Sequence, residues 1–133
     1  MNVKEMNDSL LALMETRQKL LKLNYDDERY DDLEEQLHDQ EDDFNERFGP
    51  YLEDVLEEIH EKVCPDTDVL LPTAYLPESF KGEGEFTPSS KDGIFVEAEE
   101  YPDKDARLTL VPSPVRIILT VGKSVHKEVW KAS

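Results

Sequence analysis

Residues 106–131 read ARLTLVPSPVRIILTVGKSVHKEVWK, and this stretch decides the fold. Apolar side chains occupy every second position from Val115 to Val121, which is the period of a strand with one apolar face. Turn residues at 112–114 and 122–123 separate this run from its neighbours, and connections this short require antiparallel pairing. Together with a run further upstream, the pattern predicts four strands, over 94–101, 106–111, 115–121 and 124–131.

The residues before Cys64 have a different spacing of apolar side chains. Their apolar side chains recur at steps of three and four, the spacing that places them on one helical face. We expect helices over about 3–23, 26–48 and 50–64, the first two forming an antiparallel hairpin because they are equally long and closely connected. Their narrow apolar stripes suggest that part of the hairpin projects from the body. Gly49-Pro50 predicts a break or a sharp kink, since a residue before proline disfavours helical angles.

The predicted fold is therefore α+β. A helical segment (1–64), consisting of the hairpin and a short third helix, precedes an antiparallel β segment (65–133) whose four-stranded meander packs against helices in two layers. Seven of the eight prolines and four of the five glycines follow Cys64, in line with this change. Ahead of the meander we expect a short extended segment over 69–76 and a mobile loop over 78–93. The 133 residues suit one folded domain.

Charge is distributed unevenly along the chain. The formal net charge is −17, and residues 26–48 alone contain 12 acids and two arginines, net −10. We expect Arg29 to pair with Asp26 and Asp32, and Arg47 with Asp43, which offsets only part of the repulsion. Like charges four residues apart destabilise a helix, and six such pairs occur here: Asp27/Asp31, Glu28/Asp32, Asp31/Glu35, Glu35/Asp39, Asp39/Asp43 and Asp42/Glu46.

This acidic helix suggests a docking surface for a basic protein partner. The predicted acidic face comprises Asp31, Asp32, Glu35, Asp39, Asp42 and Asp43. The alternative interpretation is that the charge only keeps the protein soluble, and a third is weak, diffuse association with divalent cations. An EF-hand is excluded, because Phe44 stands where the calcium loop requires glycine.

The composition also excludes several classes of function. Binding to nucleic acid or to an anionic membrane needs clustered lysine and arginine, which this acidic chain lacks. Its uncharged runs are too short for a membrane-spanning helix, and the N-terminus does not resemble a secretion signal. The one cysteine, Cys64, cannot form an internal disulfide and fits a reducing compartment. We therefore predict a cytoplasmic protein.

Glu57, His60 and Cys64 are the weak candidates for a metal site. They fall on one side of the third predicted helix, but a zinc or di-iron centre needs further ligands that the sequence does not supply. As a nucleophile and base, Cys64 and His60 would lack an orienting group, and nearby acids would raise the thiol pKa. We expect no metal, no cofactor and no catalytic residue, and hence a non-enzymatic binding or adaptor protein.

Two other functions remain open. If Val125 and Val129 face the core, Trp130 lies on the outer face of the sheet, where it either anchors an interface or covers the sheet of its own chain. One alternative is then an obligate homo-oligomer that uses the first helix, this outer face or a sheet edge. The other is a small ligand-binding protein or enzyme whose pocket lies between the sheet and loop 78–93.

Overall fold

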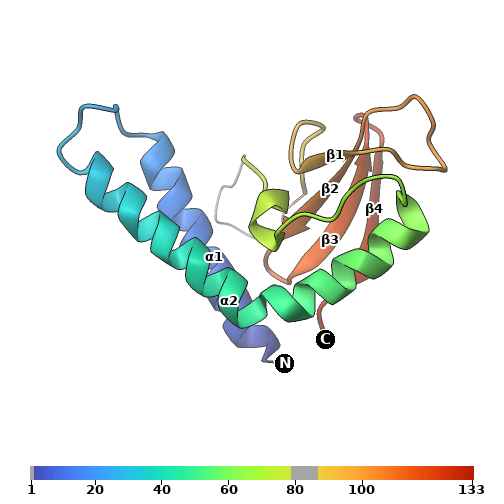
Figure 1. Cartoon of the computed structure of the whole chain (residues 1–133). Coiled ribbons are helices and arrows are strands. Elements are labelled where there is room, and N and C mark those ends of the chain that lie inside the picture. Colours follow the sequence, from blue (N-terminus) through green and yellow to red (C-terminus); the bar gives the residue numbers. More distant parts are fainter. Residues whose placement is uncertain (1, 79–86) are drawn as a thin grey trace.

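The computed structural model describes residues 2–78 and 87–133, which form two α-helices, a 3-10 turn and a four-stranded sheet (Figure 1). The predicted α+β class is confirmed. The elements are α1 (Val3–Leu21), α2 (Tyr30–Val63), η1 (Pro72–Tyr75), β1 (Ile94–Val96), β2 (Ala106–Val111), β3 (Arg116–Val121) and β4 (Val125–Lys131). The strands pair antiparallel in the order β1-β2-β3-β4, which is the predicted meander.

α1 and the first half of α2 form the predicted hairpin, which Figure 1 shows extending away from the sheet. Asn2 caps α1 by accepting a hydrogen bond from the backbone N–H of Glu5 at 3.0 Å. α2 begins at Tyr30, four residues later than predicted. The reason lies in the connection, where the Asp27 carboxylate accepts bonds from the backbone and the side chain of Arg29, so a turn replaces the first helical turn.

The prediction of a separate third helix is wrong, because α2 continues through Gly49-Pro50 to Val63. Figure 1 shows α2 changing direction about midway, so the alternative of a kink is the correct one. Pro50 lacks the N–H that would bond to the previous turn, and its ring crowds that turn. The clash that usually ends a helix before proline involves the Cβ of the preceding residue. Gly49 has no Cβ, which lets the helix continue.

The sheet contains the four predicted strands in the predicted order, but β1 is shorter than predicted. β1 ends at Val96 rather than at residue 101. Beyond it, the backbone leaves the sheet: the N–H of Glu97 donates to Thr67 Oγ1 and that of Glu99 to the carbonyl of Val63, both at 3.0 Å. These donors are therefore not available to a longer strand.

The segment between α2 and β1 also differs from prediction. In place of an extended segment over 69–76, Pro72 begins a 3-10 turn, since its fixed φ suits a first helical position. Of the predicted mobile loop, residues 79–86 lie outside the described residues. In its described part, Asp92 accepts bonds from the backbone N–H groups of Glu78 and Ser89. A Cβ at Gly93, whose φ is +84°, would lie 2.2 Å from a backbone oxygen of β2, so only glycine fits there.

One continuous cluster of buried side chains links the helices to the sheet. It includes Met6 and Leu10 of α1, Phe44 and Leu56 of α2, and Leu108 of β2. The second half of α2 and η1 lie over one face of the sheet, as Figure 1 shows. The kinked helix thus belongs both to the projecting hairpin and to the layer that covers the sheet.

Candidate functional site

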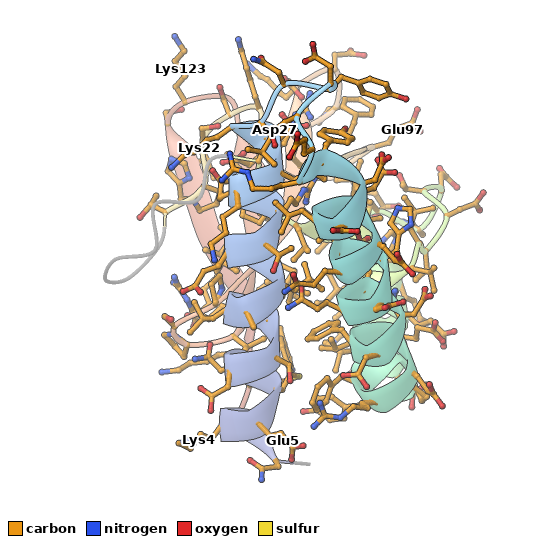
Figure 2. All side chains as sticks on the ribbon, turned by 90° about the vertical axis from the view of Figure 1, so that its left-hand side faces the viewer. Lys4, Glu5, Lys22, Asp27, Glu97 and Lys123 are labelled. Carbon is orange, nitrogen blue, oxygen red and sulfur yellow. The ribbon has the colours of Figure 1, made fainter. Side chains whose placement is uncertain are left out.

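The six predicted acidic side chains all lie exposed on the first half of α2. The opposite face of the same half-helix carries the buried residues Leu37, Phe44 and Phe48, which fix its orientation against α1. Figure 2 looks onto this hairpin, with Glu5 near the start of α1 and Asp27 at the connection between the helices. The amphipathic pattern therefore holds the acidic face toward solvent.

A shallow open groove of about 480 Å³ runs along this face. It is lined by Asp32, Glu35, Asp39 and Asp43 together with Gln36 and Gln40. Asp31 and Asp42, the other two predicted residues, do not line it. The structure thus brings four of the six predicted carboxylates to one groove and leaves two beside it.

Only one of these six carboxylates forms an ion pair among the described residues. Arg47 contacts Asp43 at 3.2 Å, as predicted, and also pairs with Glu5 of α1. Its guanidinium lies 4.8 Å from the ring centre of Phe48, so packing as well as charge holds it in place. Arg47 therefore lies at the base of the hairpin, where it pairs with Asp43 but with none of the other five carboxylates.

Arg29 forms no ion pair with the six carboxylates of the acidic face. It pairs with Asp27 at 3.1 Å, and not with Asp26 or Asp32 as predicted. The hydrogen bonds from Arg29 hold the pKa of the Asp27 carboxyl below its usual range. Because both groups are in the connection between the helices, the acidic face keeps nearly its whole charge.

The weak metal candidates are not brought together by the fold. Glu57 is exposed, whereas His60 and Cys64 are buried. Burial raises the pKa of the Cys64 thiol to about 11, which keeps it protonated at neutral pH. Among the residues the structure describes, no group of three potential ligands is placed to hold a metal ion.

His60 has a structural role that the sequence did not reveal. Its Nδ1 lies 2.8 Å from the carbonyl oxygen of Thr67, which only an N–H can satisfy. In the neutral ring its Nε2 then accepts from the hydroxyl of Tyr75 at 2.9 Å, and that hydroxyl accepts from the N–H of Leu70. Both ring nitrogens are thus used to fasten segment 67–75 to α2. No sequence spacing signals this, because the partners come from outside the helix.

Trp130 lies on the opposite side of the sheet from the one predicted. A register shift between Ile117 and Ile118 pairs Trp130 with Ile117, a core residue, while Glu128 pairs with Ile118. The half-buried indole packs against Tyr51 of α2, with ring centres 6.1 Å apart. Its placement on the outer face was wrong, and with it the basis for an interface anchor there.

The fold and this surface define an acidic α+β protein with a projecting, negatively charged helical hairpin. Comparison with protein-family models, curated proteins and solved structures finds no match. Within the described part of the chain, neither helix combines the length and the apolar character needed to cross a membrane.

Proposed function

We propose that this chain is a non-enzymatic binding or adaptor protein that docks a basic protein partner through the acidic face of α2. The observation that carries the proposal is the exposure of six carboxylates along one half-helix, of which only Asp43 has an ion-pair partner within the described residues. Such a field attracts cationic surfaces and accelerates their association.

The position of the face supports the same proposal. The hairpin extends away from the sheet, so a partner can approach α2 without meeting the rest of the protein (Figure 1). The strongly negative charge makes nucleic acid and anionic membranes unsuitable partners. The buried free thiol of Cys64 fits the reducing cytoplasm, where we place the protein.

The experiment compares two triple variants of the tagged protein in partner capture from lysate. One variant neutralises the face with Glu35→Gln, Asp39→Asn and Asp42→Asn. These positions lie beyond the first helical turn and make no ion pair among the described residues, so their neutralisation removes charge with little structural effect. The matched control removes the same charge from exposed positions in the second half of α2: Asp54→Asn, Glu57→Gln and Glu58→Gln.

We expect the wild type and the control to retain a basic protein at low salt and to lose it as the salt concentration rises. The acidic-face variant should fail to retain it at any salt concentration. Retention by all three proteins, or the absence of any salt-sensitive basic ligand, would contradict the proposal. If the charge served solubility alone, both triple variants would show equal loss of solubility and no difference in capture.

A further inference from the structure

A second groove lies at the other end of the molecule, beside the loop that joins β1 to β2. Figure 1 shows this loop at the end of the sheet remote from the tip of the hairpin. The groove has a volume of about 580 Å³, within the range of small-ligand sites. It shares no residue with the groove on α2.

The groove is lined by apolar and acidic residues together. Phe95, Ala98, Tyr101 and Pro102 supply the apolar surface. The charged residues around them are Asp66, Glu97, Glu99, Asp103, Asp105 and one cation, Lys104. Five carboxylates against a single ammonium give the groove a clear preference for a cationic occupant.

Phe95 is the unusual feature of the groove. Its side chain is 55% exposed, although it lies in the middle of the edge strand β1 between the better-covered Ile94 and Val96. Tyr101, by contrast, is half-buried and packs against the core. An aromatic ring left in water beside carboxylates is the arrangement that attracts cations by charge and by its π-face.

The groove is held in shape by backbone hydrogen bonds. The N–H groups of Glu97 and Glu99 donate to Thr67 Oγ1, just after α2, and to the carbonyl of Val63 at its end, which fixes one wall. Lys104 N–H donates to the Tyr101 carbonyl within the loop at 3.2 Å. At the far end, the N–H of Gly122 donates to the carbonyl of Asp105 at 3.0 Å. An occupant therefore would not have to order the loop, which lowers the cost of binding.

The carboxylates suit an organic cation better than a metal ion. Asp105 is already paired with Arg107 at 3.3 Å, while the other four make no ion pair among the described residues. No three of them come close enough together to hold a metal ion within the described chain. Carboxylates that do not converge on one point, next to apolar side chains, suit a cation that is itself flat and extended.

We propose that this groove binds an arginine side chain presented by a basic protein segment. The guanidinium group is planar, stacks on aromatic rings and donates to two carboxylate oxygens at once. A lysine ammonium has none of this planarity and loses more hydration on entry. The inference does not rest on the docking proposal for α2, since the two grooves have no residue in common.

The test is an NMR titration of the ¹⁵N-labelled full chain with N-acetylarginine methylamide at low ionic strength. We expect saturable shifts of the backbone amides in residues 95–105. The lysine analogue should bind several-fold more weakly and the neutral citrulline analogue not at all. Phe95→Leu keeps an apolar side chain but removes the π-face, and should weaken arginine binding about two- to fivefold.

A charge variant and two controls complete the test. Glu97→Gln with Asp103→Asn should weaken binding further, and asparagine suits the left-handed backbone at residue 103, where φ is +62°. Leu71→Ala alters a side chain that is equally exposed, at 55%, but lies outside the groove, and should bind arginine normally. The triple variant of the acidic face should also bind normally, so that the two proposals fail or succeed separately.

Three results would overturn the proposal. They are equal binding of the citrulline analogue, shifts that do not saturate, and unchanged affinity in both groove variants.

Discussion

Neutralising Glu35 and Asp39 together is expected to stabilise the folded protein. Because α2 begins at Tyr30, four of the six like-charge pairs found within residues 26–48 lie in the helix. Three of these four pairs involve Glu35 or Asp39: Asp31/Glu35, Glu35/Asp39 and Asp39/Asp43. No cation among the described residues offsets the first two, and Arg47 offsets the third in part.

The magnitude follows from the pair energies. A like-charged pair four residues apart costs about 0.2–0.5 kcal/mol, so Glu35→Gln with Asp39→Asn should raise the free energy of unfolding by about 0.6–1.5 kcal/mol. For 133 residues the entropy of unfolding is about 0.28 kcal/mol/K, which converts this gain to about 2–5 °C in Tm. The substitutions are close to isosteric and lie on an exposed face, so packing should not change.

Urea and thermal unfolding followed by circular dichroism would measure the gain, first in about 10 mM salt and then in about 1 M salt, where the Debye length falls from about 30 Å to about 3 Å. The gain should shrink at high salt. A control with Glu99→Gln and Glu100→Gln changes the net charge equally in a loop. If both variants gained the same stability, general self-repulsion would explain the result and the pairwise reasoning would be refuted.

Two buried groups provide further predictions. Tyr75→Phe leaves His60 Nε2 and the Leu70 N–H without their partner, and should lower the free energy of unfolding by about 2 kcal/mol in urea titrations, against little change for Tyr51→Phe. The Cys64 thiol, with its pKa raised by burial to about 11, should resist maleimide in native buffer and react in urea. Rapid labelling of the native protein would contradict the burial of the thiol. Because the thiol of the unfolded chain loses its proton at lower pH than that of the folded chain, the free energy of unfolding should fall as pH rises from about 9 to 11, and should fall less in Cys64→Ala.

The meander was predictable because its information is local. One face of β2 and of β3 is apolar along the whole strand, and the residues between them turn too tightly for any but antiparallel pairing. The hairpin was predictable for the same reason, since its apolar stripes recur at helical spacing. In both cases the residues that specify the structure are close to one another in the sequence.

The course of α2 was not predictable, because two local rules conflict at residues 49 and 50. Proline argues for the end of a helix, whereas glycine before it removes the Cβ part of the clash on which that rule rests. Burial decides the outcome: Phe48 and Leu52, on either side of the pair, both lie in the core and hold the two halves of α2 together. The same buried cluster includes residues of β2 and β3, which lie far along the chain.

The role of His60 was hidden for a related reason. Helical spacing placed it beside Glu57 and Cys64, and that set suggested a metal or a nucleophile. The fold instead gives both ring nitrogens to Thr67 and Tyr75, which reach the helix from the following segment. A spacing rule reports the neighbours within one element and cannot report those that another element supplies.

Trp130 shows how a single irregular residue changes a functional hypothesis. Strict alternation along β4 puts the indole on the side of His126 and Glu128, facing outward. The shift opposite Ile117 and Ile118 inserts one residue, which exchanges the two faces for everything beyond it. The most hydrophobic candidate for an interface is thereby placed against Tyr51. The two features for which we propose a cationic partner, the charged face of α2 and the exposed ring of Phe95, do not depend on the placement of this indole.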